Sequence, residues 1–393
     1  TTLFRSNKPI NLWSHEGYIP FKLDVLTPVF IGSGEAITPL EYVIRKEKNG
    51  FAIHLIDTED WLCHARQKDA VEAALNSGDL PRLRSLMHEH VDEKVYSLAR
   101  IPVSNSYLAS ILLKYINNPV GKSKVEIELF FRNPLTKNPI LPGSSLKGAL
   151  STPIIDFLDK EGMDPGVGRL KTAVERYKQE RAYKHVLEEI FGKISDHAMS
   201  ALKVSDISVP QGQTQLVAAQ EVRKKEHGKV TPKVPCEVLL PSNMGGIPLY
   251  GRLFLKTMNG IPCITLPDKT SFGIDDIIRI TGKFYKERYK KEYFNFYTYP
   301  HLKYVSDELT NVTDRIDSLL DDEILLRVGR YSHIECMTVK NNAPSNRKGF
   351  GKTRTLADGH LPFGWVILKL CSEKEYIDGM KNLEEHMQQN IRL

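Results

Sequence analysis

Residues 141–148 (LPGSSLKG) place small residues, hydroxyls and a cation where a helix is expected to begin. Small residues at a helix start let an anion approach backbone N–H groups without intrahelical partners, and the helix dipole favours negative charge there. Their spacing is not that of a Walker A loop. The segment therefore predicts a phosphate contact, and a Gly-Ser helix cap without a ligand is an equal alternative. The residues concerned are Gly143, Ser144, Ser145, Lys147 and Gly148.

Two further segments could approach a polyanion. Gly32, Ser33 and Gly34 are expected to form a flexible loop in which glycine removes the side-chain barrier to a close backbone approach. A plain β-turn is the alternative. Arg327 and Arg330 could clamp phosphates bidentately, and Tyr331 could stack on a base. Here the alternative is a strand end with surface arginines.

Residues 340–354 (KNNAPSNRKGFGKTR) are dense in basic side chains, with three amides, two glycines and one aromatic ring. They lack apolar periodicity, which favours a loop or arm over a core element. A basic arm of this kind suits single-stranded RNA, while a solvated disordered loop has a similar composition. Its candidate contact residues are Lys340, Arg347, Lys348, Lys352 and Arg354.

Composition sets wide limits around these segments. The chain has 393 residues, 41% of them hydrophobic and 26% charged, which indicates a globular protein of about two domains. The net charge of +6 permits a polyanionic partner without requiring one. Basic clusters occur at residues 223–225, 229–233, 283–291 and 347–354, although a solvated face explains any one of them.

The five cysteines are odd in number and form no Cys-x-x-Cys pair. That pattern argues against a disulfide framework and against a cysteine-based zinc site, and it favours a cytoplasmic setting. We expect no metal and no cofactor. No run approaches the roughly 18 apolar residues that span a bilayer, so no membrane partner is expected.

The order of the predicted elements indicates the α+β class. Alternating or apolar runs bounded by turn residues predict the strands. They lie at residues 21–26, 40–45, 51–56, 125–131, 202–208, 324–328 and 365–370, with a strand pair at 237–240 and 250–256. Helices are predicted from residue 61 to about 99 with a break at 78–81, from 146, at 170–191, and at 275–295 with an aromatic-basic face. Residues 211–230 predict a loop, and the tail from Glu373 is predicted to be helical or disordered.

Four segments carry a resemblance to a known superfamily. Residues 143–149 (GSSLKGA) resemble the signature of the repeat-associated mysterious proteins (RAMPs) of CRISPR systems. Residues 26–34 resemble the opening strand and glycine loop of the same superfamily, 326–330 its glycine-rich segment in the second half, and 361–366 its closing Gly-Trp strand. In order and spacing, over about residues 20 to 370, they look like the capping RAMP subunit of the type III-A (Csm) effector complex.

The resemblance implies two ferredoxin-like (RRM-like) domains with Gly-rich loops and inserted helical segments, expected at residues 1–233 and 234–393. It implies a non-catalytic subunit that binds the 3′-end side of the guide RNA (crRNA). It also implies contacts with a neighbouring backbone RAMP subunit, with the small subunit, and with target RNA as a further candidate partner.

Catalysis is the competing interpretation. Related backbone subunits cut target RNA with an aspartate shortly after the glycine loop, whereas residues 36–45 contain no Asp, so target cutting is not expected of this chain. The alternative function is a metal-independent RAMP endoribonuclease that processes repeat RNA. His15, Tyr18 and His333 would be its acid–base candidates, although nothing local in the sequence brings them together.

Overall fold

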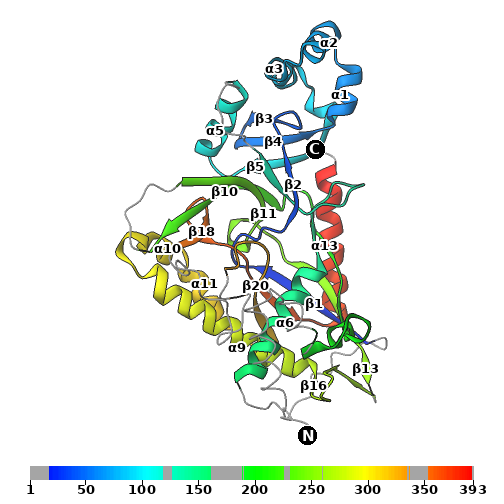
Figure 1. Ribbon diagram of the computed structural model, residues 1–393, viewed down its shortest axis with the longest axis vertical. Helices are drawn as coiled ribbons and strands as arrows, with labels where there is room; N and C mark the ends of the chain where they lie inside the picture. Colours follow the sequence, from blue (N-terminus) through cyan, green and yellow to red (C-terminus); the bar gives the residue numbers. More distant parts are fainter. Residues whose placement is uncertain are drawn as a thin grey trace.

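The protein, seen in a computed structural model, consists of two large β-sheets that follow one another along its long axis, with helices packed around them (Figure 1). The structure describes residues 17–117, 126–160, 188, 190–224, 231–258, 260–333, 336 and 353–391. Most of the helix predicted at 170–191 lies outside these residues. The mixture of helices with mainly antiparallel sheets confirms the α+β class.

The lower sheet in Figure 1 has five strands, and every neighbouring pair is antiparallel. Phe21, Leu23 and Val25 all point to its buried face, as their alternation predicts. The strand order is β17-β20-β1-β12-β8. The strands are β1 (Tyr18–Val25), β8 (Leu202–Val204), β12 (Leu249–Leu255), β17 (Glu323–Arg327) and β20 (Trp365–Leu370).

Helices α6 (Gly143–Lys160) and α9 (Ile274–Glu292) pack against this buried face, and Pro153 lies inside α6 without ending it. The predicted aromatic-basic face of α9 is buried, because Phe284, Tyr285 and Tyr289 belong to the main core. The rings of that face therefore stabilise the fold. Helix α13 (Glu373–Ile391) lies against the other face of the sheet, where Tyr376 packs on Tyr250.

The upper sheet has nine strands. Seven follow the order β2-β6-β11-β10-β5-β4-β3, while β18 pairs with β10 and β19 pairs with β18. Its hairpin β3–β4 and strand β6 lie where the sequence predicts strands. Helix α5 (Ser106–Asn117) covers one face. The strands are β2 (Gly32–Ile37), β3 (Tyr42–Glu47), β4 (Gly50–Ile56), β5 (Ser97–Val103), β6 (Ile127–Phe130), β10 (Thr214–Arg223), β11 (Thr231–Leu239), β18 (Thr353–Ala357) and β19 (Leu361–Pro362).

Two predictions in this region are wrong. Residues 211–230 are not simply a loop, because β10 runs from Thr214 to Arg223; four consecutive apolar residues at 216–219 are buried, so the alternation that marks a half-exposed strand is missing. The strands predicted at 237–240 and 250–256 exist, but they do not pair. Strand β11 pairs with β10 and β6, whereas β12 pairs with β1 and β8.

A small helical bundle caps the upper sheet. Asp57 accepts a hydrogen bond from the Asp60 N–H (3.0 Å), which begins α1 (Thr58–His64) where the sequence predicts a helix. Gly78, at φ +68°, ends α2 (Lys68–Ser77) before α3 (Leu80–His90) and α4 (Glu93–Tyr96). Helical structure then stops at Tyr96, about three residues earlier than predicted, because β5 begins at Ser97.

Short elements connect these parts. They are β7 (Ile140–Leu141), β9 (Ile207–Ser208), β13 (Thr257–Met258), β14 (Ile261–Pro262), β15 (Ile264–Thr265), β16 (Ser271–Phe272), α10 (Lys303–Glu308) and α11 (Thr310–Asp317). The strand predicted at 202–208 is thus divided into β8 and β9. Among the described residues, no helix is long and apolar enough to cross a membrane.

The expected division at residues 233 and 234 falls within β11 (Thr231–Leu239), and each sheet takes strands from both sides of it. Strand β1 closes the lower sheet with β12 and β20, and β18 extends the upper one. The sheets therefore do not follow this boundary, and the division into two domains remains a prediction.

Candidate nucleic-acid interface

Three of the four resembling segments meet at one point, which we call the glycine junction (residues 28–32, 328–331 and 363–364). The Arg330 N–H donates to the Phe30 carbonyl (2.8 Å). A Cβ on Gly329 would lie 2.3 Å from the same oxygen, and a Cβ on Gly364 would lie 2.4 Å from the Val328 carbonyl. Both glycines also have positive φ. Glycine is required at these two positions because the three chains approach more closely than any side chain permits.

Arg330 and Tyr331 lie on the outer side of the glycine junction. The Arg330 side chain is 55% exposed, pairs with Glu128 (2.5 Å) and lies over the Tyr331 ring (5.2 Å). The half-buried Tyr331 ring packs on Phe363, with centroids 5.0 Å apart, and burial raises its pKa to about 12. Arg330 therefore remains available as a surface cation, although Glu128 offsets part of its charge.

Gly32, Ser33 and Gly34 were expected in a flexible loop, but they are the first residues of β2. All three are exposed, and the register between β2 and β6 shifts between Gly32 and Ala36. Gly34 has φ +89° and open space around the position of a Cβ. The segment is therefore an irregular exposed edge whose backbone a ligand can approach.

The Gly-Ser-Ser-Leu-Lys-Gly segment begins α6, as predicted. The Gly143 N–H, however, already donates to the Asp206 carboxylate (2.8 Å), and a Cβ there would lie 2.1 Å from the Val204 carbonyl. Ser144 and Gly148 are exposed, and Ser145 and Lys147 are partly buried. The first N–H of the helix is thus not open to an anion, and Lys147 and the serine hydroxyls are the side-chain groups that could contact one.

Lys147 belongs to a cluster of basic groups. Burial and the neighbouring Lys203 charge both lower the pKa of Lys147. Burial and the Lys147 charge likewise lower the pKa of His197. The two lysine charges therefore favour an anion at this place, with the largely neutral His197 ring beside Lys147.

An exposed row of rings and charge continues from this cluster across the lower sheet. Tyr18, Phe254 and Lys203 are register partners on β1, β12 and β8, and they point away from the buried face. The Tyr18 and Phe254 rings lie 5.2 Å apart, and the Lys203 ammonium lies 5.8 Å from the Phe254 ring centre. We call Tyr18, Phe254, Lys203, Lys147 and His197 the basic-aromatic patch. Proteins that bind single-stranded RNA commonly stack its bases on aromatic rings and attract its phosphates with nearby cations.

Most of this patch is not predicted from the sequence. Tyr18 was considered only as an acid–base candidate, and Lys203 and Phe254 were not considered as contacts. Each is the exposed member of an alternating strand, which is the available signal, yet the pairing of residues 18, 203 and 254 depends on sheet order. Sequence alternation alone does not give that order.

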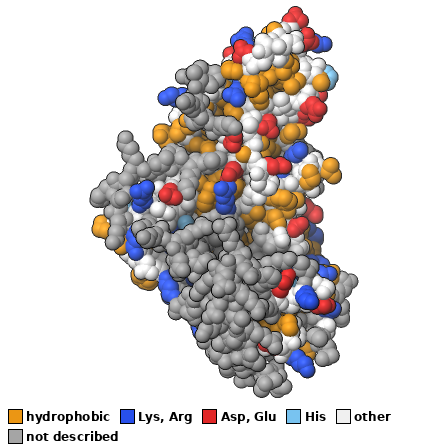
Figure 2. All heavy atoms as spheres, viewed as in Figure 1, with side chains coloured by type: hydrophobic (Ala, Val, Ile, Leu, Met, Phe, Trp, Pro, Cys, Tyr) orange, Lys and Arg blue, Asp and Glu red, His pale blue; other side chains and the backbone are white. Residues whose placement is uncertain are grey.

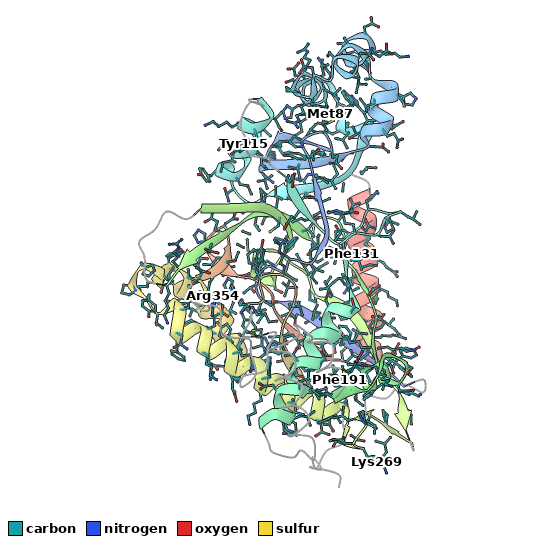
Figure 3. The ribbon with its side chains drawn as sticks, viewed as in Figure 1. Met87, Tyr115, Phe131, Phe191, Lys269 and Arg354 are labelled. Atoms are coloured by element: carbon teal, nitrogen blue, oxygen red, sulfur yellow. The ribbon has the colours of Figure 1, made fainter. Side chains whose placement is uncertain are left out.

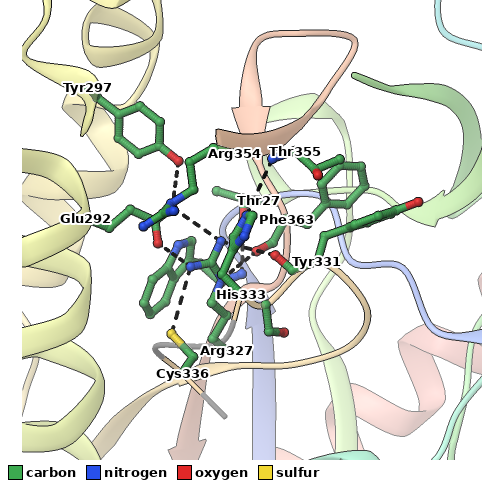
Figure 4. A network of polar contacts seen from close by, with 12 residues as sticks. Thr27, Glu292, Tyr297, Arg327, Tyr331, His333, Cys336, Arg354, Thr355 and Phe363 are labelled. Atoms are coloured by element: carbon green, nitrogen blue, oxygen red, sulfur yellow. Dashed lines mark hydrogen bonds and ion pairs between the residues drawn. The ribbon is translucent and has the colours of Figure 1, made fainter. Parts of the chain in front are cut away.

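Arg327 and Arg354 were expected on an RNA-binding surface, but the structure places both in a buried ion-pair network. Both guanidiniums are buried beside Glu292, with Arg354 only 6% exposed (Figures 3 and 4). The Arg327 guanidinium pairs with Glu292 and donates to the Phe363 carbonyl (3.0 Å), while the Tyr297 hydroxyl donates to Glu292 (2.6 Å). Arg354 is moreover a residue of β18 and not of a loop. Lys340, Arg347, Lys348 and Lys352 lie outside the described residues.

The acid–base candidates are not brought together. Tyr18 begins β1, whereas His333 accepts a long hydrogen bond from the Thr355 N–H (3.5 Å), near Arg327 and beyond the far end of β1. At about 3.3 Å per residue the length of β1 separates these regions by roughly 20 Å. His15 lies outside the described residues. Among the residues that the structure describes, no three His, Cys, Asp or Glu side chains form a possible metal site.

The fold and the interface define a mixed α+β protein with an exposed basic-aromatic strand surface. The chain belongs to the RAMP superfamily, whose family model matches residues 22–326. No curated protein matches the chain. The fold is similar to a chain of a solved Csm–crRNA–target RNA ternary complex of a type III-A CRISPR-Cas system (TM-score 0.63, 20% identity, covering 89% of this chain and 100% of that one). Another solved structure, T. onnurineus Csm5, matches with a TM-score of 0.49 at 18% identity, covering 88% of this chain and 99% of that one.

Removing the charge of Arg327 tests the buried network. We expect Arg327→Met to lower the free energy of unfolding by about 3–5 kcal/mol, because it leaves the Glu292 carboxylate buried with less compensation. Arg330→Met, three residues away, breaks only the exposed pair with Glu128 and should cost at most about 1 kcal/mol. Urea unfolding followed by circular dichroism measures both. Equal losses for the two variants would contradict a structural role for Arg327.

The same network predicts a pH dependence. Burial alone would raise the pKa of Glu292, but Arg327, Arg354, His333 and the Tyr297 hydroxyl together lower it from 4.5 to about 2. The resulting stability is present above pH 4.5 and is lost as the pH falls towards 2. The difference in unfolding free energy between the wild type and Glu292→Gln should therefore shrink by about 2 kcal/mol between pH 7 and pH 3. A difference independent of pH would show that the carboxylate charge is not what stabilises the fold.

Proposed function

We propose that this chain is a non-catalytic guide-RNA-binding subunit of a type III-A CRISPR effector complex, on the 3′-end side of the RNA, acting in the cytoplasm. The observation that carries the proposal is the basic-aromatic patch on the sheet of a RAMP fold. Stacking on rings supplies affinity without sequence preference, and the lysines supply the attraction to phosphates. The solved complex that contains the similar chain also contains crRNA and target RNA, which supports RNA as the partner.

The proposal includes the ferredoxin-like architecture of the lower sheet. Strands β20, β1, β12 and β8 lie side by side in that order. Helix α6 follows β1 and α9 follows β12 along the chain, which agrees with a β-α-β-β-α-β unit. We propose that the upper sheet belongs to the second such unit. A neighbouring backbone RAMP subunit and the small subunit are the proposed protein partners.

The absence of catalysis is also part of the proposal. The separation of Tyr18 from His333 supports it, since acid–base groups act only within hydrogen-bond reach of one substrate. Guide RNA and repeat RNA incubated with the purified chain should therefore be recovered intact. Defined cleavage abolished by His333→Ala would favour the endoribonuclease instead.

Neutralising Lys147 tests the electrostatic part of the patch. Lys147→Gln should weaken guide-RNA binding and reduce the slope of log affinity against log salt concentration by about 0.7, the value for one lost contact to a single strand. Filter binding at several salt concentrations measures the slope. Lys68→Gln is the matched control, because Lys68 is exposed on the distant helix α2. If both variants keep the wild-type slope, Lys147 is not an RNA contact.

Removing the Tyr18 ring tests stacking separately. The side chain is 39% exposed, and Tyr18→Ala should cost about 1–3 kcal/mol of binding free energy for one lost stacked base while leaving the salt slope unchanged. Tyr107→Ala on α5 is the control, since Tyr107 is also an exposed tyrosine. Fluorescence anisotropy with a labelled guide RNA measures both. Identical guide-RNA affinities for Tyr18→Ala and Tyr107→Ala would show that the rings of the basic-aromatic patch do not contact the RNA.

A further inference from the structure

A cavity of about 300 Å³ lies apart from the basic-aromatic patch, where the end of α9 meets β10 and β18. Its volume is at the lower end of the range for small-molecule sites, which suits one nucleotide and excludes a duplex. In the space-filling view, basic side chains lie along the left margin, on the side where Figure 1 shows α9 and α10 (Figure 2). The cavity is lined by Lys224, Arg288, Lys291, Glu292, Asn295, Phe296, Cys336 and Arg354.

The charges around this cavity favour an anion. Four of the lining residues are cationic, and Glu292 is the single carboxylate among them. Glu292 is held by Arg327 and Arg354, so its charge is already compensated. Burial raises the pKa of Cys336 to about 11, so this thiol is neutral and adds no negative charge. A net positive cavity of this kind attracts a phosphate.

Two of the cations are held in fixed positions. Arg354 and Arg288 are only 6% and 8% exposed, and Arg288 pairs with Asp156 (3.1 Å). Guanidiniums fixed in this way are pre-organised, because little side-chain freedom is lost when they bind phosphate oxygens.

The other two cations are lysines nearer the solvent. Lys224 lies 5.3 Å from the ring centre of Tyr299, and Lys291 is exposed. Within the described part of the chain, neither lysine forms an ion pair. Their charges are therefore available to a ligand, and each can be removed without breaking a buried pair.

The backbone at the cavity is irregular. Helix α9 continues into a π-helical turn, η4 (Tyr293–Tyr297), which carries the Asn295 amide and the Phe296 ring to the cavity wall. π-Helical turns are rare in proteins as a whole, and those that occur are often found at functional sites. The exposed amide can donate to or accept from a sugar hydroxyl or base, whereas the Phe296 ring is buried beneath Arg354, which it helps to fix. The wall thus has groups for the organic part of a nucleotide as well as for its phosphate.

We propose that this cavity binds the phosphate and adjoining nucleoside of a single ribonucleotide, either free or at the end of an RNA chain. If the nucleotide belongs to an RNA chain, this inference rests on the proposed function. The side chains that form the site lie outside the basic-aromatic patch. The two arginines hold the phosphate, the two lysines add attraction at the opening, and Asn295 contacts the nucleoside.

The test uses the full chain with Lys224→Gln and Lys291→Gln combined. Lys290→Gln is the matched control, since Lys290 is the adjacent exposed lysine and pairs with Asp317 away from the cavity lining. Isothermal titration measures binding of adenosine 5′-monophosphate and inorganic phosphate. Fluorescence anisotropy compares short single-stranded RNAs with a 5′-phosphate, a 3′-phosphate or no terminal phosphate. Urea unfolding confirms that the variants are folded.

The double variant should lose about 10–100-fold in affinity for the ligand, as expected when charged hydrogen bonds worth about 1.5–3 kcal/mol are removed, while Lys290→Gln stays within about 2-fold of the wild type. A preference for one terminal phosphate would identify an RNA end as the ligand. Binding of the mononucleotide without such a preference would identify a free nucleotide.

The inference is overturned if neither a mononucleotide nor a terminal phosphate binds, or if the double variant binds like the wild type. Guide-RNA binding that still depends on Lys147 would then leave the proposed function intact. If no RNA binds at all, the proposed function fails, and the mononucleotide titration still decides about the cavity.

Discussion

The buried carboxylate of Glu292 is the constraint on which the arrangement of the two sheets depends. Arg327 comes from β17 of the lower sheet and Arg354 from β18 of the upper sheet, and both guanidiniums reach this one side chain at the end of α9 (Figure 4). Isolated charges at such depth would cost several kcal/mol each. The carboxylate is compensated in full only when both sheets and α9 are in their native positions, so the network couples their folding.

This coupling also positions the two surfaces that concern function. On one side, Arg327 donates to the Phe363 carbonyl and so fixes the chain next to the glycine junction, where Arg330 and Tyr331 are exposed. On the other side, Glu292 and Arg354 form part of the wall of the phosphate cavity. A ligand in the cavity would therefore meet side chains already held by the fold, which reduces the ordering cost of binding.

The sequence predicts local structure well where one physical signal dominates. A short apolar run located β20 at residues 365–370, and a capping aspartate located the start of α1. It fails where tertiary context decides. Strand β10 is buried along residues 216–219 and shows no alternation, and the partners of β11 and β12 depend on sheet order. The sequence shows that Arg327 is charged. It does not show that the guanidinium pairs with the buried carboxylate of Glu292, 35 positions away.

The same limit explains which part of the interface could be foreseen. The Gly-Ser-Ser-Leu-Lys-Gly segment is contiguous and was found, but its expected mechanism changes, because Asp206 occupies the Gly143 N–H and so competes with any anion at the helix start. Side chains then become the main candidates for binding an anion there. Lys147 lies close enough to Lys203 for their charges to interact, and Lys203 shares its row with Phe254 and Tyr18. Attraction to phosphate and stacking on a base thus arise from residues that only the folded sheet assembles.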